Sequence, residues 1–409
     1  MRKIASTCSS TWLGIGAATA AGALLAVAAL AACSAVATSD SQPVSPFDAA
    51  APEAGTAADG GAPSDAAALT PGAVIQANAL VLVHAASFPA FRMCFAGATG
   101  DLPQPSVDLM PDSNVVGVDV GTAVRLAARP EMLGHAFVFP ELVLRPFYPS
   151  VGAPGPSCAK LLADSSISQY AVDVGAVTES VSSGVHALVL TGCRAASIDP
   201  MASKARCGAD WDAATGNLAL RTLTLVAYAR AGDTRLPVQL VQLSPALQGV
   251  AEGRALGLAF GALDSGAPGG PEPFVEGAVP FGEAVPNPPA ILDYSATDLA
   301  SYATSGMFVT LGGPIDDAGM PTGGDAGARQ IVIAESLADI QKRSSPRSLP
   351  PDWFSVTSSY VVLSVGDTDP RLGDGGRDDD PRRALHLLAV PLATPDAGAS
   401  NPTATDAGL

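Results

Sequence analysis

Apolar residues between positions 74 and 391 occur in short runs that Gly, Pro, Asp and Ser interrupt. Short runs rich in Val, Leu and Ile are typical of strands in a β-sandwich or β-barrel. A period near that of an amphipathic helix occurs only at 331–342, so helix is expected to be a minor component. The clearest predicted strands lie at 80–84, 136–144, 187–190, 220–228, 238–243, 360–365 and 385–390.

The predicted strands repeat in the same order. Residues 82–86 (LVHAA) open a first block and residues 240–244 (LVQLS) open a second, and a proline follows each within three residues. Each block ends with a strand that runs into glycine, a polar loop and a last strand. The repetition predicts an all-β protein with two tandem antiparallel β-sandwich domains, Ig-like or Greek-key in type, at 77–232 and 233–392. The alternative is a chance similarity between apolar strands.

The amino-terminal segment begins with basic residues, and a long apolar run follows them. Basic residues at 2–3 precede the run, which begins near residue 12 and ends at Leu30, Ala31, Ala32 and Cys33. This ending resembles the lipobox of bacterial lipoproteins. The resemblance implies that residues 1–32 are a lipoprotein signal peptide and that Cys33 carries the lipid. An ordinary secretory signal and an uncleaved membrane anchor are the alternatives.

Two further segments are predicted to be disordered. Residues 33–76 contain five acidic and no basic residues among Ala, Gly, Pro, Ser and Thr, which predicts an acidic tether. Residues 393–409 have a similar composition and predict a disordered tail.

The residue after Cys33 indicates the location of the protein. It is Ser34 rather than aspartate, which favours an outer-membrane lipoprotein that faces the periplasm or the cell surface.

Four cysteines remain after Cys8 and Cys33 are set aside. An even number of cysteines in an exported chain predicts two disulfides, for which three connectivities exist. The segment between Cys193 and Cys207 is polar and turn-like, which favours that pair and leaves Cys94 with Cys158. The sequence contains no CxxC motif, so these cysteines are not expected to bind a metal.

The openings of the two blocks resemble a known group of proteins. Residues 80–91 (LVLVHAASFPAF) and 238–247 (VQLVQLSPAL) are similar to the first strands of tandem domains of unknown function in bacterial surface lipoproteins. Cys158 lies where such first domains often carry a cysteine. The aspartate that usually follows the first proline is absent after both Pro89 and Pro245. The resemblance implies an antiparallel sandwich at the cell surface and supplies no catalytic residues.

Composition and motifs indicate a protein without catalytic activity or cofactor. The formal charge of −17 argues against binding to nucleic acid, which needs a basic face. The sequence contains no HExxH or GxSxG motif and no glycine-rich phosphate loop. All four histidines lie in or beside predicted strands, where packing is the more common role, and they are His84, His135, His186 and His386.

Two loops are the predicted binding surface, because they follow equivalent strands in the two blocks. They are the 193–211 loop and the charged 366–383 loop, whose aspartates faintly resemble calcium ligands but alternate with arginines. We therefore expect a surface-anchored binding or structural module that contacts an extracellular or envelope protein or a polysaccharide. The alternatives are an exported hydrolase with a site built from strand-end residues, and a cation-dependent adhesin. Trp211 and Trp353 are candidate recognition residues.

The Cys33→Ala substitution should abolish lipid attachment and release the chain that has lost residues 1–32 from the membrane fraction, because the sequence after Cys33 predicts no other hydrophobic anchor. Labelling with radioactive palmitate, followed by fractionation of the cells, measures both effects. Palmitate on the variant would contradict the assignment of Cys33.

Overall fold

The structure is a computed structural model in which strands greatly outnumber helices. All the residues that it describes belong to one compact unit, Asp65–Leu409. The signal peptide, Cys33, the tether except Val74, the tail and Trp353 lie outside them. The described residues are 77–97, 117–126, 133–147, 156–232, 234–264, 270–295, 303–320, 329–344, 359–367 and 383–392, with Val74, Asp298, Ser301 and Thr322.

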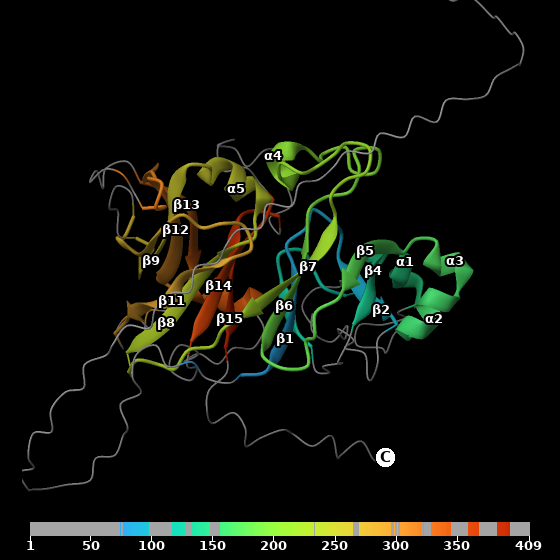
Figure 1. Ribbon diagram of the computed structural model, residues 1–409, viewed down its shortest axis with the longest axis horizontal. Helices are drawn as coiled ribbons and strands as arrows, with labels where there is room; N and C mark the ends of the chain where they lie inside the picture. Colours follow the sequence, from blue (N-terminus) through green and yellow to red (C-terminus); the bar gives the residue numbers. More distant parts are fainter. Residues whose placement is uncertain are drawn as a thin grey trace, which may run out of the picture. The chain divides into compact units, whose positions relative to one another are not determined.

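Seven strands form the N-terminal sheet pair (Figure 1). One sheet has the order β3-β1-β6-β7, with strands Ala123–Arg125, Ala79–His84, Val185–Thr191 and Ala219–Leu225. The other has the order β2-β4-β5, with strands Phe91–Ala96, Gly134–Pro140 and Val172–Val177. Short helices lie outside the sheets: α1 (Glu141–Leu144), η2 (Arg145–Phe147), α2 (Cys158–Ala163), α3 (Ser165–Ser168) and α4 (Lys204–Cys207).

Eight strands form the C-terminal sheet pair. One sheet has the order β11-β8-β14-β15, with strands Ala284–Asp293, Arg235–Gln242, Tyr360–Val365 and His386–Pro391. The other has the order β10-β9-β12-β13, with strands Pro273–Gly277, Arg254–Ala262, Ser305–Pro314 and Gln330–Ser336. Helices α5 (Pro245–Ala251) and α7 (Leu337–Arg343) accompany this pair.

The two sheet pairs correspond strand by strand. In each pair the first strand lies parallel to the next-to-last strand, β1 to β6 and β8 to β14. In both, the last strand pairs antiparallel with that next-to-last strand. The order β2-β4-β5 corresponds to β9-β12-β13, and β10 is an added edge strand. An all-β fold is therefore confirmed. The prediction of purely antiparallel sheets is wrong, because the pairs β1–β6 and β8–β14 are parallel and make both of these sheets mixed.

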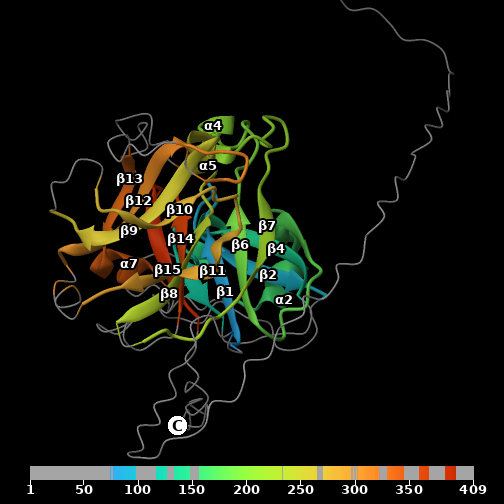
Figure 2. The ribbon, with the colours of Figure 1, turned by 60° about the vertical axis from the view of Figure 1, so that its left-hand side comes forward.

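Three apolar cores hold the sheets together. Leu82 lies in the core between the two sheets of the N-terminal pair, and Leu240 lies in the equivalent core of the C-terminal pair. The neighbouring residues, Val83 and Val241, point the opposite way into a third core. This third core, called the shared core, lies between the sheet that contains β1 and β6 and the sheet that contains β14 and β15. Figures 1 and 2 both show these two sheets side by side. Strands β1, β6 and β14 are consequently buried along their whole length.

Two predicted elements need correction. The strand expected at 136–144 ends at Pro140, and residues Glu141–Leu144 form α1. The helix expected at 331–342 begins only at Leu337, because residues Gln330–Ser336 pair with β12 as a strand. The Ser336 hydroxyl accepts a hydrogen bond from the N–H of Asp339 and so caps the helix at the change of structure.

The Leu363→Ala substitution tests the shared core. Leu363 is fully buried there, so truncation should lower the free energy of unfolding by about 2–5 kcal/mol. Denaturant titration measures the loss, and Leu142→Ala is the control because Leu142 is 76% exposed. Equal stabilities of the two variants would show that the two sheet pairs do not share this core.

Candidate functional site

Several loops meet at one end of the central strands. Strands β1, β6, β8 and β14 lead at their carboxyl ends into Ser87, the 192–217 loop, α5 and Asp367, respectively. Ser87 forms a parallel bridge with Cys193, and α4 in the 192–217 loop packs against α5 (Figure 1). Residues from both sheet pairs thus contribute to one loop surface.

The 192–217 loop is held in one conformation by covalent and polar contacts. The disulfide Cys193–Cys207 closes it. The Asn217 side chain accepts a hydrogen bond from the N–H of Cys193 at 2.9 Å and donates one to the Cys207 carbonyl at 2.8 Å. The half-buried Trp211 donates its indole N–H to the Arg194 carbonyl at 3.0 Å. These contacts among the loop's own residues hold its backbone in place.

The second disulfide lies in the outer sheet of the N-terminal pair, away from the loop surface. Cys94 of β2 is bonded to Cys158 of α2, which fastens the helices α1 to α3 to the outer sheet. The presence of two disulfides is confirmed, and the pairs are the ones that the polar, turn-like segment between Cys193 and Cys207 favoured. Both lie within the N-terminal sheet pair.

A glycine ends the equivalent strands β6 and β14. Gly192 and Gly366 have φ angles of +84° and +111°, which favour glycine. A Cβ atom would lie 2.3 Å from the Asn217 carbonyl oxygen at Gly192 and 2.5 Å from the Ala384 carbonyl oxygen at Gly366. No other residue fits either turn without a shift of the backbone. The backbone therefore turns in a similar way after β6 and after β14.

Asp367 connects the two predicted binding loops. This buried side chain accepts hydrogen bonds at Oδ2 from Arg206 of α4 at 3.1 Å and from Arg383 Nε at 3.0 Å. Arg206 belongs to the 193–211 loop, whereas Asp367 and Arg383 are the ends of the 366–383 loop. The structure therefore brings together the two loops that the sequence predicted, although residues 368–382 lie outside the described part.

The ion pairs of Asp367 disfavour calcium binding at this carboxylate. The Asp367 carboxylate faces two guanidinium groups, which repel a divalent cation. Within the described ranges, no group of three or more His, Cys, Asp or Glu side chains is arranged to hold a metal ion. The remaining aspartates of the 366–383 loop, from Asp369 to Asp380, are outside the described residues.

The loop surface presents apolar side chains to solvent. Ile198 and Met201 are 55% and 51% exposed, on the loop that the Cys193–Cys207 disulfide closes. The Asp199 side chain between them accepts a hydrogen bond from the Ser87 hydroxyl at 3.2 Å, so this part of the loop also contacts the segment that follows β1. Exposed apolar groups on a rigid support are suited to recognition of a partner.

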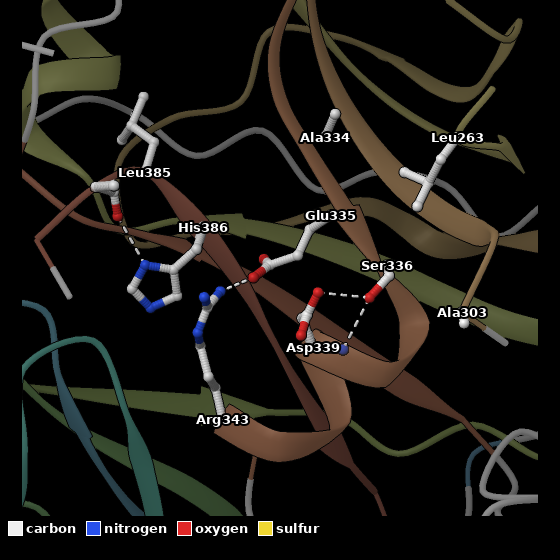
Figure 3. Close-up of a pocket in the computed structure, with 10 residues that line it drawn as sticks. Leu263, Ala303, Ala334, Glu335, Ser336, Asp339, Arg343, Leu385 and His386 are labelled. Carbon is white, nitrogen blue, oxygen red and sulfur yellow. Dashed lines mark hydrogen bonds and ion pairs between the residues drawn. The ribbon is translucent and has the colours of Figure 1, made fainter. Parts of the chain in front are cut away.

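A polar pocket of about 410 Å³ lies elsewhere, beside β13, α7 and the start of β15. Figure 3 shows the Arg343 guanidinium between His386 and Glu335. Arg343 forms an ion pair with Glu335, whose other oxygen accepts the N–H of Leu387 at 2.7 Å. Ser336 donates to Asp339 at 2.7 Å, which lowers the pKa of that carboxyl, and burial lowers the pKa of Arg343. The polar groups of the pocket therefore bind one another and the edge of β15.

The four histidines do not converge on a reacting centre. His84 is buried beside the Phe91 ring, and the His186 ring contacts the Ser183 carbonyl oxygen at 2.7 Å. His135 lies within β4, not before a strand as expected, and its exposed ring is 3.4 Å from Asp173. His386 lines the pocket, where the nearby Ser336 hydroxyl is engaged by Asp339.

Comparisons with protein families, with curated proteins and with solved structures find no match to this chain. Within the described ranges, none of the helices has the length and apolar character that a membrane crossing requires.

Sequence reasoning missed the residues that organise the loop surface. Sequence patterns indicate no role for Asn217 or Arg206, and they mark Asp367 only as one of the aspartates in the 366–383 loop. A signal for Asn217 existed, since it lies two residues before β7 and opposite the glycine that ends β6. No local signal marks the contact between Arg206 and Asp367, because 161 positions separate them.

Asp367→Asn should lower the free energy of unfolding by about 3–5 kcal/mol, because two largely buried guanidinium groups lose their carboxylate. Chemical denaturation measures the change. The control is Asp293→Asn, which removes an exposed carboxylate 3.9 Å from Arg235 and should cost less than about 1 kcal/mol. A loss as small for Asp367→Asn as for the control would remove the role given to this ion-pair cluster.

Proposed function

We propose that the protein is a non-catalytic, surface-anchored lipoprotein that acts as a binding or structural module of the bacterial envelope. The observation that carries the proposal is Asp367, which joins loops from both sheet pairs into one surface through Arg206 and Arg383. A surface composed in this way needs a rigid scaffold, which the shared apolar core supplies.

The scaffold in this proposal consists of two tandem, duplicated β-sandwich domains of Ig-like or Greek-key type. The matching strand orders and the equivalent glycines Gly192 and Gly366 support a duplication. Each sheet pair also has its own apolar core, as an independent sandwich requires. Residues 77–232 and 233–392 would then be the two domains.

In the proposal a lipid on Cys33 anchors the protein in the outer membrane, and residues 33–76 form the tether. The lipobox-like ending Leu30-Ala31-Ala32-Cys33 and the acidic composition of the following segment support this arrangement. The partner would be an envelope or extracellular protein or a polysaccharide. No nucleic acid is expected, because the net charge is strongly negative.

A hydrolase is the second candidate, and the polar pocket beside α7 is the observation that favours it. Glu335, Arg343 and His386 lie there within a space of about 410 Å³. The contacts of these groups weigh against the idea, because Glu335 is used by Arg343 and by the β15 backbone. Catalysis would require these contacts to break.

Replacement of Ile198 and Met201 together by serine should weaken attachment to the partner by about tenfold or more, because both side chains are exposed on the loop surface. The thermal midpoint should not change, since neither side chain is buried. The assay measures binding of the full chain to protein and polysaccharide fractions of the cell envelope. Met320→Ser is the control, because Met320 is 56% exposed in the turn after β12.

Three results would contradict the proposal. The first is attachment by the double serine variant that equals attachment by the Met320→Ser control. The second is turnover of an ester, peptide or glycoside panel that disappears in Glu335→Gln while the fold is retained, which would replace the binding module by the hydrolase. Binding that appears only after addition of calcium would favour the cation-dependent adhesin instead.

A further inference from the structure

Strand β7 is the last strand at one edge of the sheet β3-β1-β6-β7. Just before β7, the N–H of Asn217 donates to the carbonyl oxygen of Cys193, which follows β6, at 2.9 Å. Hydrogen-bonded pairs of this kind recur at every second residue of an antiparallel ladder. Continued along the register of β6 and β7, the alternation turns the backbone of Leu223 toward β6. The N–H and C=O groups of Thr222 and Thr224 therefore point outward from the edge of the sheet.

Strand β15 is the counterpart of β7 in the C-terminal pair, and its edge is closed. The outward N–H of Leu387 donates to Glu335 Oε2 at 2.7 Å, and the outward N–H of Ala389 donates to Ser344 Oγ at 2.7 Å. The next outward position is Pro391, which has no N–H. Glu335 lies in β13, beside α7 in Figure 3, and Ser344 directly follows α7. Along its whole described length, β15 therefore offers no N–H to a further strand.

The edge of β7 lacks this cover. Strand β5, the counterpart of β13, also lies near β7, but residues 178–184 then lead to β6 without a helix equivalent to α7. Within the described ranges, no group of the protein hydrogen-bonds to the outward N–H of Thr222 or Thr224. An edge strand with unpaired backbone groups is a template for pairing with another chain.

A cleft of about 350 Å³ lies beside this part of β7. Thr222 and Thr224 belong to one wall, and Glu283 and Asn287 of the C-terminal pair belong to the other. The Tyr228 hydroxyl donates to Asn287 Oδ1 at 2.6 Å, which connects the two walls. Among the described residues that line the cleft, the exposed Glu283 is the only charged one. The cleft therefore combines an open strand edge with a carboxylate.

We propose that β7 binds an extended peptide segment of another protein as an additional strand, and that a Lys or Arg side chain of this segment pairs with Glu283. The peptide backbone completes the hydrogen bonds that the edge leaves open, and alternate peptide side chains enter the cleft. A second copy of this chain is a poorer occupant, because it carries the same formal charge of −17 and brings a second Glu283.

This site is separate from the loop surface. The cleft lies beside the second half of β7, whereas Ile198 and Met201 lie in the loop that precedes β7. The proposal therefore depends neither on the loop surface nor on the lipid anchor. Replacement of Ile198 and Met201 together by serine should leave peptide binding at β7 unchanged.

Heptapeptides displayed on phage and selected against the full chain are the probe, and the enriched peptides are then synthesised. They should be rich in Val, Ile and Thr and should carry Lys or Arg. Thr224→Pro removes the outward N–H, which an edge strand tolerates, and should weaken peptide binding by about tenfold or more. Thr224→Ala is the matched control, because it keeps the N–H and should bind as the wild type does.

Glu283→Lys tests the charge. It should weaken binding of the basic peptides by about fivefold, because the variant replaces attraction by repulsion. Glu252→Lys is the control, since Glu252 is exposed at the end of α5, does not line the cleft and changes the net charge equally. Its peptide binding should equal that of the wild type.

Hydrogen exchange on the wild type reports the added strand without any variant, because a bound peptide should slow exchange of the Thr222 and Thr224 amides. The site is wrong if bound peptide leaves the exchange of these amides unchanged. It is also wrong if no peptide is enriched, or if Thr224→Pro and Thr224→Ala bind the peptides equally. A dimer of the wild type that Thr224→Pro abolishes would replace the peptide by a second copy of the chain.

Discussion

The apolar contact between the two central sheets is the constraint on which the rest of the structure depends. Strands β1, β6, β8 and β14 pack with one face against the outer sheet of their own pair and with the other face in the shared core. A strand buried on both faces has no position for a solvated side chain, so it reads as a nearly continuous apolar run. The runs LVLVH and YVVLSV in β1 and β14 are examples.

The polar contacts at the carboxyl ends of these strands depend on that core. Asp367 meets Arg206, and His386 meets Gly121, only while the central sheets hold the two pairs in contact. Each contact is buried, so each is costly when its geometry is lost. A rigid scaffold of this kind allows loops to vary in sequence while their positions are retained.

Several of the strands that the sequence predicted are buried on both faces, such as β1, β6 and β14, whereas β7 was predicted although it is mostly half-buried. Strands β9 and β12 were not identified because glycines interrupt them. A Cβ atom at Gly257 would lie 2.5 Å from Thr310 Oγ1, and one at Gly306 would lie 2.4 Å from the Glu335 carbonyl oxygen. Glycine is required at these positions because a neighbouring strand lies too close for a side chain. The local sequence does not reveal which strand that is. Both loops were assigned to the binding surface because they follow equivalent strands. The contacts of Arg206 with Asp367 and of His386 with Gly121 are long-range and have no local sequence pattern.

The central claim is that the shared core makes the two sheet pairs one cooperative unit. Native-state hydrogen exchange as a function of denaturant tests it most directly, because it gives a free energy of opening for each strand. Amides of β1 and β6 should open together with amides of β8 and β14, with the same free energy and the same denaturant dependence. Two separate groups of opening free energies, one for each sheet pair, would contradict the account.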